Sequence, residues 1–106
     1  MSRRRRRASD QTLLIVESLL SDRQAWKYGY SLSQQTGLPS GTLYPILMRL
    51  ADSGFLDTKW TDPEREGRPP RHVYRLSVSG ACWAREALTN RTILASKLNP
   101  ALDSGR

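Results

Sequence analysis

Few side chains in this sequence have both the chemistry and the spacing that catalysis or metal binding requires. The chain has 106 residues with one histidine, His72, and one cysteine, Cys82. A lone His and a lone Cys do not supply the ligands of a zinc site, and a single Cys forms no internal disulfide. His72 has no evident catalytic partner, and no phosphate loop is present. We therefore expect no enzyme, no metal and no cofactor, and we expect Cys82 to be buried.

Basic side chains are more abundant than acidic ones in this chain. The chain has 17 Lys and Arg residues against 10 Asp and Glu residues, for a net charge of +7. Five of them form one run, and the other 12 nearly balance the acids. The run is Arg3, Arg4, Arg5, Arg6 and Arg7. Such an arm can neutralise phosphates or enter a minor groove. A block of like charges is equally typical of a disordered, solubilising terminus, and both interpretations stay open.

The segment Gly37–Leu50, GLPSGTLYPILMRL, combines a helical pattern with an unusual beginning. Apolar residues at i, i+3, i+4 and i+7 predict a helix from a cap at Ser40 to about Ser53, with one buried stripe. The stripe consists of Leu43, Ile46, Leu47 and Leu50. A first turn of Ser40, Gly41 and Thr42 has no bulk to hold the backbone away from a phosphate, and the N–H groups at a helix start attract anions. Pro45, without an N–H, fits near a helix start.

Three further helices are expected around this one. The first runs over about 10–20 with Asp10 as its cap, and its apolar residues cover so much of its surface that it should pack on two sides. A short second helix spans about 31–36. A last helix spans about 78–98, with Ser77 as its cap.

Between the third and last helices, alternating residues predict two strands, at 56–60 and 72–76. The charged, proline-rich segment 61–71 joins them as a hairpin, or wing. The expected fold is mostly α with a small β-hairpin wing, that is, a winged helix-turn-helix followed by a C-terminal dimerisation helix.

This order of elements favours DNA binding. The major groove of B-DNA admits one helix, whose N-terminal residues reach base edges. Basic residues of a wing can contact phosphates, and the candidates here are Lys59, Arg68 and Arg71. Two other interpretations stay open: the wing is a solvated, charge-balanced loop, or the whole fold is a protein–protein module.

Two segments of the chain resemble the PadR family of bacterial transcriptional regulators. They are YGYSLSQQTGLPSGTLYPILMRLADSGFLDTKW and EGRPPRHVYRLSVSGACW. The resemblance covers about Tyr28 to Trp83. It implies a dimeric winged-helix protein that binds inverted-repeat operators on double-stranded DNA, usually as a repressor. By motif it places the DNA contacts at Tyr30, Ser31, Ser40, Gly41, Thr42, Tyr44, Pro45 and Arg49, with Arg68 and Arg71 on the wing.

The resemblance also implies a homodimer whose last helix packs against the partner's first helix, with effectors bound at or near that interface. The candidate dimer contacts are Leu14, Ile15, Ala84, Leu88, Leu94 and Leu98. Trp83 and Trp26 are candidates for stacking on a small aromatic or lipophilic effector. The alternative for both is that they are core or interface aromatics, which is the commoner role of Trp.

We thus predict an arm at 1–9, a winged helix-turn-helix at 10–76, a dimerisation helix at 77–98 and a frayed tail at 99–106. No apolar run approaches the roughly 18 residues of a membrane span, and the single cysteine fits the cytoplasm. The expected function is a homodimeric, sequence-specific transcriptional repressor. The alternatives are an architectural DNA binder driven by the arm and a winged-helix protein–protein adaptor.

Overall fold

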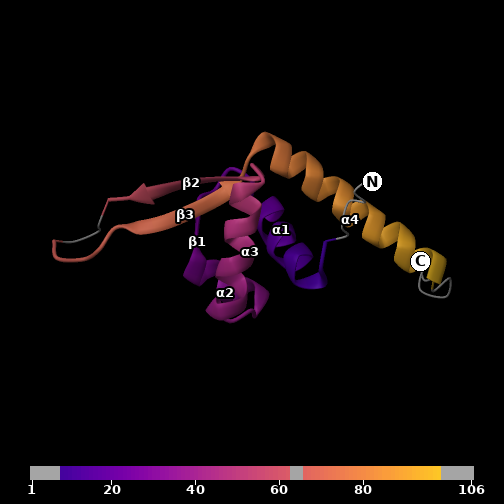
Figure 1. Cartoon of the computed structure of the whole chain (residues 1–106), viewed down its shortest axis with the longest axis horizontal. Coiled ribbons are helices and arrows are strands. Elements are labelled where there is room, and N and C mark those ends of the chain that lie inside the picture. Colours follow the sequence, from indigo (N-terminus) through magenta and orange to yellow (C-terminus); the bar gives the residue numbers. More distant parts are fainter. Residues whose placement is uncertain (1–7, 63–65, 99–106) are drawn as a thin grey trace.

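The computed structural model describes residues 8–62 and 66–98, with side-chain positions as far as residue 92. The arginines Arg3 to Arg7 and the expected tail at 99–106 lie outside the described residues. In chain order the elements are α1 (Asp10–Ser21), β1 (Lys27–Tyr28), α2 (Gly29–Thr36), α3 (Ser40–Asp52), β2 (Leu56–Thr61), β3 (Arg71–Leu76) and α4 (Val78–Leu98). The mostly helical fold with a small sheet confirms the expected winged helix-turn-helix (Figure 1).

One hydrophobic core joins the first three helices, the base of the sheet and the beginning of α4. The periodic stripe of α3 is its central part, because all four stripe residues are at most 6% exposed. The main core residues of the other elements are Leu13, Ile15, Val16 and Leu19 of α1, Leu32 of α2, Leu56, Tyr74 and Leu76 of the sheet, and Ala81 and Ala84 of α4. Burial of this kind stabilises a domain by about 1.5–3 kcal/mol for each large aliphatic side chain.

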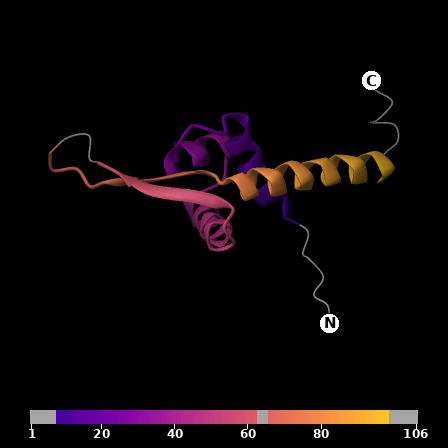
Figure 2. The same ribbon diagram turned by 90° about the horizontal axis from the view of Figure 1, so that it is seen from above.

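The sheet has the strand order β1-β3-β2, with both pairs antiparallel. The hairpin register runs from Leu56 opposite Leu76 to Thr61 opposite Arg71. The strand β1 is not predictable from the sequence, because two residues are too few to form a pattern. The outer part of the hairpin projects to one side of the helical body and α4 projects to the other, as Figure 2 shows from above.

Two predicted helix caps differ in the structure. Ser9, not Asp10, caps α1, and its hydroxyl accepts a hydrogen bond from the N–H of Thr12 at 3.1 Å. Asp10 instead begins the first turn, where a carboxylate is favourable to the helix dipole. Pro39, not Ser40, precedes α3, and its carbonyl accepts from the N–H groups of Thr42 and Leu43. Ser40 therefore already has a helical backbone.

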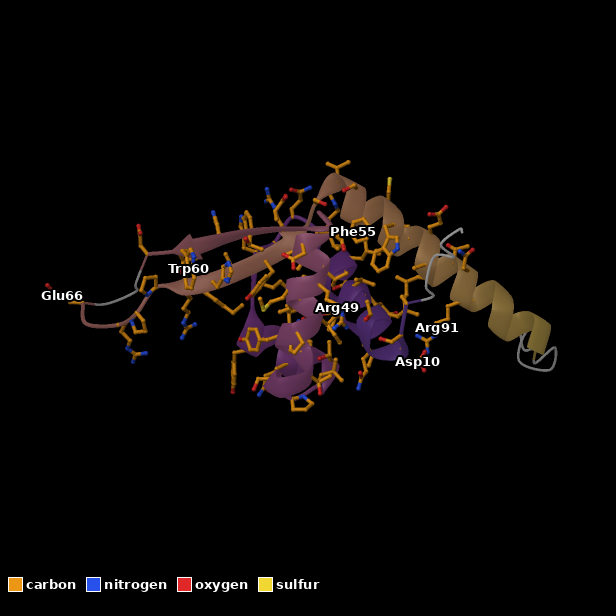
Figure 3. The ribbon with its side chains drawn as sticks, in the orientation of Figure 1. Asp10, Arg49, Phe55, Trp60, Glu66 and Arg91 are labelled. Atoms are coloured by element: carbon orange, nitrogen blue, oxygen red, sulfur yellow. The ribbon has the colours of Figure 1, made fainter. Side chains whose placement is uncertain are left out.

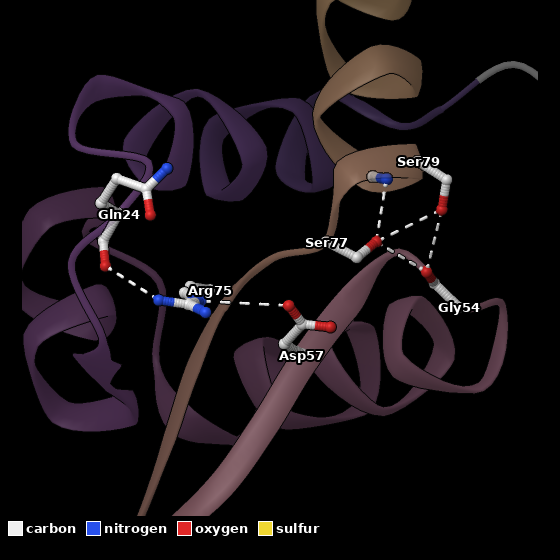
Figure 4. Close-up of polar contacts among 7 residues, drawn as sticks. Gln24, Gly54, Asp57, Arg75, Ser77 and Ser79 are labelled. Atoms are coloured by element: carbon white, nitrogen blue, oxygen red, sulfur yellow. Dashed lines mark hydrogen bonds and ion pairs between the residues drawn. The ribbon is translucent and has the colours of Figure 1, made fainter.

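The junction between the sheet and α4 is tightly built (Figure 4). The hydroxyl of Ser77 accepts from the N–H of Gly80 at 3.0 Å, which confirms Ser77 as the cap of α4. The hydroxyls of Ser77 and Ser79 donate to the carbonyl of Gly54 at 2.7 and 3.2 Å. Gly80 is packed so closely that an added Cβ would collide with the backbone carbonyl of Phe55. These contacts set the direction in which α4 leaves the sheet.

We expect Gly80→Ala to lower the free energy of unfolding by about 1–3 kcal/mol, because a methyl group there forces two backbone segments apart. Gly41→Ala is the matched control, since nothing lies within 4 Å of a Cβ at Gly41. Alanine should stabilise that helical position by about 0.5–1 kcal/mol. Denaturant unfolding of both variants measures the difference, and an unchanged stability of Gly80→Ala would contradict the described junction.

Candidate nucleic-acid interface

The helix α3 has two distinct faces. One carries the buried stripe, and the opposite one points into solvent. This second face, called the outward face below, consists of Gly41, Tyr44, Pro45, Met48, Arg49 and Asp52, all exposed. Figure 3 shows Arg49 at α3, in the body from which the wing projects to the left. The helix is 13 residues long, so several turns of its outward face are available to a groove.

The first turn of α3 allows very close approach. Gly41 has open space around it, so a ligand can reach the backbone itself. The first N–H groups of any helix lack partners within the helix, and they suit a phosphate oxygen. Pro45 lies inside α3 and has no N–H to offer the carbonyl of Gly41, four residues earlier. The first turn therefore presents both donors and an acceptor to a ligand on this side.

Met48, like Asp52, is an outward-face residue that the site prediction left out. It is 66% exposed and lies one turn beyond the exposed Pro45. The only apolar group on the base edges of a major groove is the thymine methyl. The outward face thus combines an apolar strip, Pro45 and Met48, with a single cation, Arg49. The helical wheel predicts that Met48 is exposed, but a methionine at such a position does not by itself indicate DNA binding.

Tyr44 has a mixed position. It is 40% exposed, but its phenol also packs against Gly29 at the start of α2, where a Cβ would collide with it. Burial raises the pKa of Tyr74 above its ordinary value, and the nearby Tyr44 adds to the increase. Both phenols hence lie where α2, α3 and β3 meet. The two α2 candidates differ: Tyr30 is 72% exposed, whereas Ser31 is half-buried.

The two faces of the hairpin carry different chemistry. Side chains alternate along a strand, so Leu56, Tyr74 and Leu76 define the face that packs on the helices, called the inner face. Lys59, Val73 and the arginines Arg71 and Arg75 share the opposite, outer face. The predicted contacts Lys59 and Arg71 thus both point away from α3, while Arg68 is exposed near the tip of the hairpin.

Cations and aromatic rings pair on the outer face. Lys59 Nζ and Arg75 Cζ lie 4.6 and 4.2 Å from the ring centroid of Trp26. Arg71 Cζ lies 4.8 Å from the ring of Tyr28. Arg75 also donates to the carbonyl of Gln24 at 3.3 Å and lies 3.9 Å from the carboxylate of Asp57. These contacts connect β1 and the residues just before it to the hairpin. The ring of Trp26, an effector candidate, is therefore already in contact with two cations.

The other effector candidate, Trp83, packs at the beginning of α4. Its indole stacks on Phe55 with ring centroids 4.7 Å apart and planes 11° from parallel. Trp83 and Phe55 are both half-buried. Cys82, its neighbour, is exposed, which corrects the expectation of a buried thiol. The cause is that Ala81 and Ala84 face the core from the same helix turns, so Cys82 points outward.

The dimer candidates divide into three groups. Ile15 and Ala84 are both 0% exposed because they pack inside this protomer, which corrects the expectation that they form part of a surface. Leu14 is 40% exposed and Leu88 is half-buried. The side chains of Leu94 and Leu98 lie outside the described ones. Arg91, which interrupts the apolar stripe of α4, lies 3.6 Å from Asp10 of α1.

The part of the chain that the structure describes contains neither a metal site nor a membrane span. Within residues 8–62 and 66–98, no group of three His, Cys, Asp or Glu side chains could hold a metal ion. Among the described helices, none is long and apolar enough to cross a membrane.

The exposed helix face and the wing define a winged-helix DNA-binding protein. Residues 18–86 match the family of PadR-like transcriptional regulators. The match covers more than half of the chain, so the protein belongs to this family. Members of the family bind DNA and are transcription regulators, not enzymes. This confirms the expectation of a DNA-binding regulator that is not an enzyme.

Solved structures agree with this assignment. A PadR family regulator from Eggerthella lenta is 28% identical, with a TM-score of 0.70 over 89% of this chain and 82% of that one. A protein from Streptococcus mutans is 29% identical, with a TM-score of 0.67 over 87% and 89% of the two chains. A PadR-like transcription factor from Bacteroides fragilis is 25% identical, with a TM-score of 0.69 over 85% and 87%. No curated protein matches the chain in sequence.

We expect Met48→Ala to weaken binding to the protein's DNA site about fourfold, or about 0.8 kcal/mol, the value of one methylene-sized apolar contact. Equilibrium titrations should compare duplexes with thymine and duplexes with deoxyuridine, which lacks the methyl group, at each position in turn. At the contacted position the wild type should bind the deoxyuridine duplex more weakly than the thymine duplex. Met48→Ala should bind these two duplexes equally well. An equal further loss in both proteins at every position would remove Met48 from methyl contact.

Proposed function

We propose that this PadR-like regulator is a homodimer that binds an inverted-repeat operator and represses transcription. The observation that carries the proposal is the exposed outward face of α3, which begins in an open glycine turn and lies beside a projecting, arginine-bearing wing. The outward face supplies base contacts through Tyr44, Pro45, Met48 and Arg49, and the half-buried Thr42 beside this face supplies another. Arg68, near the tip of the hairpin, supplies a phosphate contact, and Arg71 contributes its charge from the outer face. A bound repressor of this kind acts by occupying the DNA that the transcription machinery needs.

The homodimer is supported by the family and by the position of α4. This 21-residue helix leaves the body on the side opposite the wing (Figures 1 and 2), so it can reach a second copy without blocking α3. Leu14 and Leu88 are the described candidates that retain surface for it. A two-fold axis through this region would place two α3 helices about one DNA turn apart on one side of the duplex.

An effector, where one acts, would bind at the stack of Trp83 on Phe55. Phe55 joins α3 to β2, and Trp83 belongs to α4, so a flat apolar ligand inserted there would change how α4 leaves the DNA-binding body. In the dimer this alters the separation of the two α3 helices. A ligand that prefers the altered arrangement releases DNA by shifting the population of the two states.

Selection from a random duplex pool at physiological salt tests the proposal. We expect full-length protein to recover an inverted repeat with half-site centres about one turn, roughly 10 base pairs, apart. Sedimentation equilibrium of the free protein should give the mass of two chains. Recovery of single half-sites by a monomer would overturn the homodimer.

A second selection, with protein lacking residues 1–7, separates this proposal from an architectural binder driven by the arginine arm. This deletion ends before Ser9, so the cap of α1 is kept. The specific regulator should recover the same motif with weaker affinity. Loss of all binding, or a pool with no motif and affinity that vanishes as salt increases, would favour the arm-driven binder instead.

A further inference from the structure

The wing carries an exposed tryptophan, Trp60, that has no role in the proposed function. Trp60 is 66% exposed. The alternation of β2 places it on the inner face, in line with Leu56 and Thr58. Figure 3 shows it on the part of the hairpin that projects beyond the helices. So large an apolar side chain contributes little to the core from this place, and the fold alone does not account for it.

Trp60 is held in place by a series of rings that begins in the core. Its indole stacks on the imidazole of His72, with centroids 4.4 Å apart and planes 6° from parallel. The ring of His72 lies 4.8 Å from the ring of Tyr74, and its Nδ1 lies 3.2 Å from the Tyr74 hydroxyl. Tyr74 itself is 6% exposed. We call these three residues the ring ladder. A side chain that is fixed before binding loses less conformational entropy when a ligand covers it.

The ring ladder connects the wing to α3. The phenol of Tyr44, on the outward face of α3, packs against Gly29, and the residue before Gly29, Tyr28, pairs with Val73 next to Tyr74. From there the ladder leads outward along the hairpin to Trp60. When α3 occupies a major groove, the inner face of the wing therefore faces the DNA backbone that borders this groove.

The DNA backbone offers two kinds of surface, and the wing has a counterpart for each. Its phosphates match Arg68, which is exposed near the tip of the hairpin. Its deoxyribose rings present C–H groups, which match the flat face of an indole. We propose that Trp60 packs on a deoxyribose of the operator beside the groove that α3 occupies, with His72 as its positioning residue. This inference rests on the proposed function and assigns the wing a contact that is not electrostatic.

Salt dependence distinguishes such a contact from a phosphate contact. Binding to a fluorescein-labelled duplex with the selected site should be titrated over a salt series for the wild type, Trp60→Ala, Trp60→Phe and Arg68→Gln. We expect Trp60→Ala to weaken binding about tenfold at every salt concentration, with an unchanged slope. Trp60→Phe should keep most of the affinity, and Arg68→Gln should reduce the slope by about one unit. Thr58→Ala, on the same face of β2, is the matched control and should bind like the wild type.

Tryptophan emission gives an independent measurement. The difference between the wild type and Trp60→Phe isolates the signal of Trp60 without changing Trp26 or Trp83. This signal should change when the duplex is added. His72→Ala should lower the fluorescence anisotropy of Trp60 in the free protein and weaken DNA binding, and His72→Phe should restore both, because a phenyl ring can also support the indole.

The outcomes separate this inference from the proposed function. If the wild type binds its site but Trp60→Ala binds equally well, or if Trp60 emission does not change on binding, the Trp60 contact is wrong and the regulator remains. A change in salt slope for Trp60→Ala would also overturn it, since the loss would then come from displaced arginines. If the wild type selects no site, the proposed function fails first.

Discussion

The burial of one face of α3 is the constraint on which the rest of the structure depends. Leu43, Ile46, Leu47 and Leu50 fix the rotation of this helix, because turning it would expose side chains worth about 1.5–3 kcal/mol each. With that rotation fixed, the outward face with Gly41, Pro45 and Met48 must point into solvent. Under the proposed function, the polar first turn of α3 presents a bare backbone to an anionic groove.

The wing depends on a different set of interactions, which lie on its two faces. On the outer face, Trp26 and Tyr28 engage the cations Lys59, Arg75 and Arg71, so β1 holds the base of the hairpin. On the inner face, the ring ladder extends the core outward as far as Trp60. The three outer-face cations are therefore held against aromatic rings, whereas Arg68 lies near the tip of the hairpin. A rigid wing holds its contacts at a constant distance from α3.

The periodic parts of the fold could be predicted from the sequence, and the contacts between distant segments could not. The stripe of α3 and the alternation of β2 and β3 are local patterns, so these elements were found, with caps displaced by one residue at Ser9 and Pro39. The two-residue strand β1 has no pattern. The stacking of Trp60 on His72 depends on the hairpin register, which a proline-rich loop does not fix in advance. Ile15 and Ala84 were assigned to a surface because an apolar helix does not reveal which of its sides faces its own core.

Hydrogen–deuterium exchange with and without a duplex that carries the selected site tests the central claim most directly, because it locates the bound surface without mutation. The account predicts slower exchange for the amides of residues 40–50 in α3 and for the hairpin strands β2 and β3, with α4 unchanged. Slower exchange confined to α4, with α3 and the hairpin unaffected, would contradict it.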